Sequence, residues 1–174
     1  MEFLNALKAN IPDYAKDTRL NLDGVLARSS LDAADATGAA LAAAYAARSK
    51  KIVDAIRSSG ELSEVDTNAA LTAAALMGMN NVWYPYIEMA ADEDLKTQRA
   101  ELRMNAYATH AGVDKKRFEL FALAASIVGK CHFCVQSHYK MLKENGFSAQ
   151  QLRDVGRIAA VITAAALALE AEGA

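Results

Sequence analysis

Hydrophobic and polar positions along the chain follow the three-to-four-residue period of amphipathic helices, and no stretch keeps the two-residue period of a strand. Asp32, Ser63 and Ser148 are typical helix N-caps, and Gly60 and Gly146 are typical helix ends. The pattern therefore predicts an all-α protein, with helices near residues 1–11, 14–25, 33–45, 52–59, 64–77, 102–108, 117–128, 131–145 and 149–170.

Two interruptions are expected in this pattern. Gly78 with Asn80-Asn81 predicts a break or sharp turn, and the acidic residues 92–94 predict a loop. The 174 residues predict one domain, 1–174, with a weak internal repeat at about 30–80 and 114–170. The two copies are offset by 82 residues at their Ala-rich helices (40–43 and 122–125) and by 86 at their glycines, which places extra residues around the cysteines.

Composition narrows the function. The formal net charge is −2 and no basic face is evident, so a nucleic-acid partner is not expected. No run of 18 or more apolar residues exists, and the first ten residues do not resemble a secretory signal, so we expect a cytoplasmic protein without a membrane partner. The hydrophobic content of 53% is high for a monomer of this size and favours a symmetric homo-oligomer.

The chain has two cysteines, placed together as Cys131-His132-Phe133-Cys134, and His138 follows one helical turn later. On a helix, residues 131, 134 and 138 fall on one stripe, so the histidine can exchange a proton with Cys134. A cysteine at a helix start is also favoured as a thiolate. This pattern indicates a thiol–disulfide redox site.

Glu119 is a candidate base, because a carboxylate among apolar neighbours has a raised pKa. The alternative is that Glu119 lies on the solvent face with Lys115 and Lys116. Other interpretations of the cysteines remain open. A structural disulfide over so short a loop contributes only about 2 kcal/mol. Zinc bound by the two cysteines and His138, with Glu119, His110 or His132 as a fourth ligand, gives a binding or interaction protein without turnover.

The spacing of these residues resembles a known signature. Glu119, eleven residues, Cys131, two residues, Cys134, three residues and His138 is similar to the active-site pattern of the alkyl hydroperoxide reductase AhpD family, in the carboxymuconolactone decarboxylase-like superfamily. The resemblance extends to residues 9–17, 77–84 and 102–105 and covers nearly the whole chain. It implies an all-helical fold with two similar halves, assembled as a homotrimer.

The resemblance also implies an activity: a thiol-dependent peroxidase and disulfide reductase, an antioxidant enzyme with no tightly bound cofactor and no metal. Cys134 would attack peroxide, Cys131 would resolve the sulfenic acid, and His138 with Glu119 would relay the proton. Electrons would come from dihydrolipoamide on a lipoyl-bearing acyltransferase subunit, kept reduced by lipoamide dehydrogenase, and pass to an alkyl hydroperoxide, hydrogen peroxide or a partner peroxiredoxin. A different reductant is the alternative within the superfamily. Some members place a histidine directly before the second cysteine; here Phe133 stands there, and His132 is a further candidate.

Overall fold

The computed structural model describes residues 1–173 and contains helices but no strand in that range. The all-α prediction is confirmed. The elements are α1 (Glu2–Asn10), η1 (Asp13–Ala15), α2 (Lys16–Leu26), α3 (Ala33–Ala46), α4 (Lys50–Ser59), α5 (Glu64–Ala90), α6 (Glu93–Thr97), α7 (Asn105–Thr109), η2 (His110–Gly112), α8 (Lys115–Gly129), α9 (His132–Glu144) and α10 (Ala149–Ala171), where η marks a short 3₁₀ turn.

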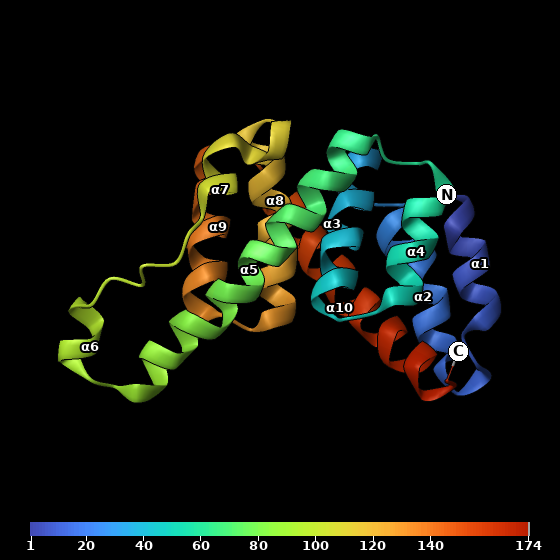
Figure 1. Cartoon of the computed structure of the whole chain (residues 1–174). Coiled ribbons are helices and arrows are strands. Elements are labelled where there is room, and N and C mark those ends of the chain that lie inside the picture. The colour runs from blue at the N-terminus through green and yellow to red at the C-terminus, as the bar shows by residue number, and fades with distance from the viewer. Residues whose placement is uncertain (174) are drawn as a thin grey trace.

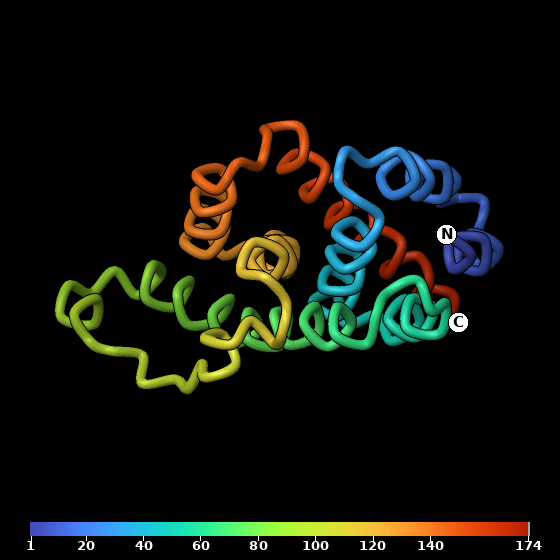
Figure 2. Tube along the Cα trace, turned by 90° about the horizontal axis from the view of Figure 1, so that it is seen from above, coloured from blue at the N-terminus to red at the C-terminus, as the bar shows by residue number. Residues whose placement is uncertain are grey.

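Helix α8 lies at the centre of the molecule and contacts α3, α5, α9 and α10. In Figure 1, α1, α2 and α4 flank this core on the side where both termini lie, and α7 and α9 lie on the opposite side. Figure 2 shows α5 running along one edge of the molecule and carrying α6 well away from the body. In the described part of the chain, no helix is both long and apolar enough to span a membrane.

Small residues allow α3 and α8 to approach closely. The alanines at 39, 40, 42, 43 and 44 of α3 are all fully buried. At Gly38, an added Cβ would overlap the ring of Phe121 on α8. The Ala-rich stretches that look weakly hydrophobic in the sequence therefore form a close helix contact in the core, because small side chains bring the two backbones together.

Most predicted helix ends are confirmed. Asp32, Ser63 and Ser148 each accept a backbone N–H of the first turn, and Ser148 completes a capping box with Gln151. Gly60 ends α4 in the left-handed conformation, as glycine does most readily.

The predicted break at Gly78 and Asn80-Asn81 is wrong, because α5 continues unbroken through them to Ala90. Tertiary contacts explain the difference. Met77 is fully buried, and the Asn81 side chain donates to the carbonyl of Ala125 on α8 at 3.2 Å. These contacts offset the roughly 1 kcal/mol that glycine costs inside a helix.

The region after α5 also differs from expectation. Residues 92–94 are not a plain loop, since Asp92 caps the short helix α6 by accepting the N–H groups of Asp94 and Leu95. The helix expected at 102–108 begins only at Asn105. Acidic residues are as typical of helix starts as of loops, which is why the acidic composition of residues 92–94 led to the wrong prediction of a loop.

Candidate active site: a disulfide beside a buried imidazole and carboxylate

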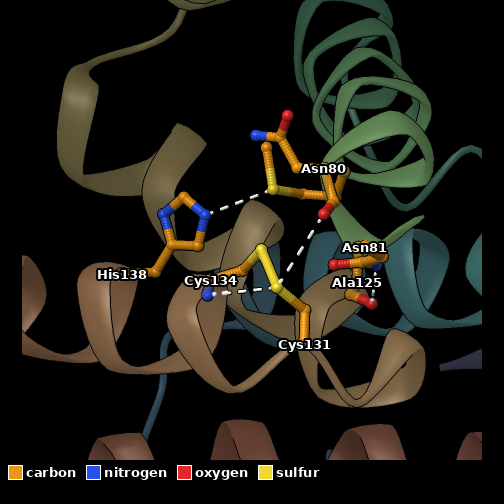
Figure 3. The surroundings of a disulfide bond; sticks show 7 residues. Asn80, Asn81, Ala125, Cys131, Cys134 and His138 are labelled. Atoms are coloured by element: carbon orange, nitrogen blue, oxygen red, sulfur yellow. Dashed lines mark hydrogen bonds between the residues drawn. A yellow bond between two sulfur atoms is a disulfide. The ribbon is translucent and has the colours of Figure 1, made fainter. Parts of the chain in front are cut away.

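Cys131 and Cys134 are joined as a disulfide at the start of α9, with their Cα atoms 5.3 Å apart (Figure 3). Cys131 is the N-cap residue, and its sulfur accepts the N–H of Cys134 at 3.2 Å. A sulfur held at a helix N-terminus lies in the positive end of the helix dipole, which favours the thiolate after reduction. The sequence prediction that these cysteines begin a helix is confirmed.

The turn before the cysteines has its own sequence requirements. Lys130 ends α8 with a positive φ of 55°, and the N–H of Cys131 donates back to the carbonyl of Ser126 at 3.4 Å. Gly129 has no room for a side chain, because an added Cβ would overlap the side chain of Asn81. Helix α5 thus packs directly behind the disulfide, and Figure 3 shows Asn80 and Asn81 on that side.

His138 lies one turn after Cys134 on the same helix and is only 5% exposed. Its Nδ1 is 2.5 Å from Oε2 of Glu119, and its Nε2 is 3.2 Å from the Met77 sulfur on α5. In the disulfide form, the imidazole therefore lies beside the cysteine pair, with one nitrogen held by a carboxylate and the other facing a weak acceptor. Cys134 and His138 therefore lie on one face of α9, as the sequence predicts.

Glu119 lies in the interior on α8 and is 2% exposed, so the solvent-face alternative is wrong. Burial acts to raise its pKa, but the hydrogen bonds with His138 and with the hydroxyl of Tyr107 outweigh burial, and the net effect lowers the pKa. The expectation of a raised pKa is therefore also wrong. The sequence showed apolar neighbours along α8 but not the two donors that other elements bring to the carboxylate.

Tyr107 is the site residue that sequence reasoning missed. Its hydroxyl donates to Oε1 of Glu119, so the two carboxylate oxygens are held by different partners. Burial and the bond to Glu119 raise the pKa of Tyr107 well above its ordinary value, so it remains a donor. A single tyrosine in a weakly patterned segment carries no sequence signal for this contact.

A cavity of about 330 Å³ opens onto this cluster. Of the two cysteines, Cys134 lines it and Cys131 does not; Cys131 is fully buried. Aromatic, small and polar side chains from α5, α7 and α9 complete its wall, together with Met104, which precedes α7: Asn80, Tyr84, Met104, Tyr107, Ala108, Phe133, Ser137 and His138. A small substrate in this cavity would meet the Cys134 sulfur with the imidazole next to it.

His132 lies outside this cluster. Its side chain is 74% exposed and pairs with Glu88 on α5, with Nδ1 and Oε1 3.1 Å apart. His110 lies beside the rings of Tyr107 and Phe118. In residues 1–173, no group of three or more His, Cys, Asp or Glu side chains is arranged to hold a metal ion.

The fold and site define the class of protein: an all-helical thiol–disulfide protein whose two cysteines lie beside a buried imidazole–carboxylate pair. Comparisons with known proteins agree. The Carboxymuconolactone decarboxylase family matches residues 93–174, which include the whole cluster. The chain belongs to the alkyl hydroperoxide reductase AhpD family.

Three relatives establish this membership. The chain is 46% identical over 173 residues to alkyl hydroperoxide reductase AhpD of Rhodospirillum centenum, covering 98% of this chain and 92% of the relative. It is 42% identical over 170 residues to the protein of the same name from Bradyrhizobium sp., covering 97% and 93%. It is 40% identical over 164 residues to that from Coxiella burnetii, covering 91% and 92%.

Proposed function

We propose that this protein reduces alkyl hydroperoxides and hydrogen peroxide with its Cys131–Cys134 pair. The observation that carries the proposal is the cavity in which the Cys134 sulfur lies beside the His138–Glu119 pair. The names of the relatives, alkyl hydroperoxide reductase AhpD, support the same activity.

The chemistry begins from the dithiol. The Cys134 thiolate attacks the peroxide, the O–O bond breaks, and a sulfenic acid and an alcohol form. The Cys131 thiol then attacks the Cys134 sulfur, so that a disulfide forms and water leaves. Two thiols and one hydroperoxide thus give one disulfide, one alcohol and one water. Cys134 takes the attacking role because it lines the cavity, whereas Cys131 lies behind it.

His138 accepts the thiol proton on Nε2 and returns it to the departing alkoxide. Glu119, which stays ionised, holds Nδ1 and stabilises the imidazolium that forms. His132 has no part in this relay, since it faces Glu88 at the surface.

The reductant we propose is dihydrolipoamide on a lipoyl-bearing acyltransferase subunit, recycled by lipoamide dehydrogenase and NADH. A dithiol reduces a disulfide by attack on one sulfur, through a mixed disulfide, and Cys134 is the sulfur that the cavity exposes. A peroxiredoxin disulfide is an alternative electron acceptor to peroxide itself. The cytoplasm, where NADH is available, remains the predicted location.

A homotrimer is the assembly that we propose. Helix α6 extends away from the body in both views (Figures 1 and 2), and large apolar side chains on α5 near its base are exposed, Met89 at 77% and Val82 at 69%. A second copy covering this arm would bury these side chains. Light scattering should give about three times the 18.6 kDa chain mass, and a monomer at micromolar concentration would rule the trimer out.

One assay tests the function directly. NADH oxidation is followed with lipoamide dehydrogenase, lipoamide, an alkyl hydroperoxide and this protein, and each component is omitted in turn. Turnover should require all of them and should disappear with Cys134→Ser. If the protein consumes peroxide with another thiol donor but not with lipoamide, only the electron source is wrong. Unreactive thiols with one zinc per chain would overturn the proposed function.

A further inference from the structure

Tyr107 is hydrogen-bonded to the thiol cluster through its hydroxyl, which donates to Oε1 of Glu119. We propose that Tyr107 is a positioning residue: by donating to Glu119 it keeps this carboxylate ionised and thereby fixes the His138 tautomer that can take the proton of Cys134. The catalytic consequence of this hydrogen bond rests on the proposed function. The ionisation of Glu119 and the tautomer of His138 can be measured in the protein without turnover.

Glu119 is nearly enclosed, and its charge is balanced by few groups. Besides Tyr107 from α7 and His138 from α9, the charge near it is Lys115 on its own helix α8. Helices α3 and α5 also pack on α8, but their acidic residues Asp35 and Asp66 pair with Arg117 and not with the Glu119 cluster. His110 lies against the Tyr107 ring. Among residues 1–173, the Tyr107 hydroxyl and the His138 ring are therefore the two hydrogen-bond partners of the carboxylate.

Removing the hydroxyl leaves one oxygen of a buried carboxylate without a donor, which favours the protonated acid. A protonated Glu119 would donate its own hydrogen to Nδ1 of His138. The imidazole would then carry its hydrogen on Nε2, the nitrogen that must accept the proton of Cys134. With Glu119 ionised, the hydrogen lies on Nδ1, because the carboxylate is a much stronger acceptor than the Met77 thioether that lies 3.2 Å from Nε2, and Nε2 remains free to accept a proton.

Packing holds Tyr107 in the geometry that this role needs. Its ring meets Phe118 edge-on, with centroids 5.6 Å apart and an interplanar angle of 88°. Phe118 is fully buried and precedes Glu119 in the chain, so the tyrosine is anchored next to the group it serves. Tyr107 also lines the cavity, which places the relay within reach of the substrate space.

The test compares Tyr107→Phe with Tyr139→Phe, which removes a hydroxyl from an exposed position next to His138 and outside the cavity. Single-turnover oxidation of the reduced proteins by peroxide is measured from pH 3.5 to 10, wherever both proteins remain folded. In Tyr107→Phe the acid limb of the rate profile should move up by about one pH unit, because a higher pH is needed to ionise Glu119, and the rates should converge at alkaline pH. A purely structural role would lower the rate at every pH.

Nitrogen NMR of the His138 ring provides a readout that needs no turnover. At neutral pH the unmodified protein should show the Nδ1–H tautomer, and on acidification the change toward Nε2–H should begin about one pH unit higher in Tyr107→Phe than in the unmodified protein. An Nε2–H tautomer in the unmodified protein would overturn the proposal whether or not any variant folds. An unchanged pH dependence of the tautomer and of the rate in a folded Tyr107→Phe would do the same. Correct tautomers without peroxide turnover would instead count against the proposed function.

Discussion

The turn between α3 and α4 is built like the turn between α8 and α9, yet only the second carries thiol chemistry. Arg48, two residues after the end of α3, has a φ of 61°, and Lys130, directly after the end of α8, has a φ of 55°. Ser49 then caps α4 by accepting the N–H of the third residue after it, as Cys131 caps α9. Each cap residue also donates its own N–H to the carbonyl five residues earlier. The backbone turn is therefore a general device and carries no chemistry by itself.

The two turns differ in the side chains at matching distances from the cap. In the α3–α4 turn, Ile52 stands at the position of the second cysteine, Ile56 at that of His138 and Thr37 at that of Glu119. Both isoleucines are buried core residues. The α3–α4 turn also lines a larger cavity, about 730 Å³ against about 330 Å³ at the thiols. Cavity size thus does not mark the reactive site; the sulfur, imidazole and carboxylate do.

The similarity of the two turns shows where the extra residues of region 114–170 lie. The offset of 82 between the Ala-rich helices still holds at Ser49 and Cys131, so the additional residues lie after the cap, in the longer α9, and not before the cysteines. A true sequence repeat between residues 30–80 and 114–170 remains a prediction.

Removal of the sulfurs should have the largest effect on peroxide turnover, because it makes the α8–α9 turn chemically like the α3–α4 turn. In Cys134→Ser, peroxide reactivity should essentially disappear. In Cys131→Ser, Cys134 should react once and stop as a sulfenic acid, since its resolving partner is missing. Mass spectrometry after one equivalent of peroxide, with a sulfenic-acid trap, measures both. A sulfenic acid trapped only on Cys131 would mean that the two roles are reversed.

Loss of the relay should have the next largest effect. His138→Gln and Glu119→Gln should each slow peroxide turnover at pH 7 by roughly 10- to 1000-fold, within the range of general acid–base assistance. The loss should shrink toward a pH of about 8.5, where a thiol ionises without help. The double variant should be little slower than either single variant, because the relay is broken only once. A normal rate for Glu119→Gln at pH 7 would remove Glu119 from the mechanism.

A single added methyl group should destabilise the close contact between α3 and α8. Gly38→Ala places a Cβ into the Phe121 ring and should lower the free energy of unfolding by about 1–3 kcal/mol. Gly78→Ala is the matched control, because an added Cβ there meets nothing within 4 Å in mid-helix, and it should stabilise by up to about 1 kcal/mol. Urea unfolding compares the two. Equal stabilities would show that α3 and α8 separate easily.

The smallest effect is expected when a thiol pair is moved to the α3–α4 turn, where no peroxide turnover should appear. Ser49→Cys with Ile52→Cys, in a chain that lacks Cys131 and Cys134, places a thiol pair on the first turn. The pair should form a disulfide on oxidation, because the cap geometry matches, but it should not turn over peroxide, since Ile56 and Thr37 offer no relay. The mass change and the peroxide assay report the two outcomes. Rapid turnover would show that the backbone turn alone is sufficient.

Much of the fold was readable from the chain because local rules fix it. Caps such as Asp32 and Ser148 act within one turn, and the spacing of Cys131, Cys134 and His138 follows from the helix period alone. The predicted break at Gly78 and Asn80-Asn81 is wrong because of contacts that are not local. Contacts with α8 and α9, distant in sequence, override a weak local preference there.

The sequence by itself determined that the protein is helical, where the helices capped by Asp32, Ser63 and Ser148 begin, and that two thiols and an imidazole share one face. Only the tertiary structure decided the state of Glu119. Its neighbours along α8 are apolar, but Tyr107 and His138 reach it from two other helices, and their hydrogen bonds reverse the effect of burial on its pKa. Spacing within a helix is a local property that sequence encodes directly, whereas the electrostatic environment of a buried group depends on the elements that pack around it.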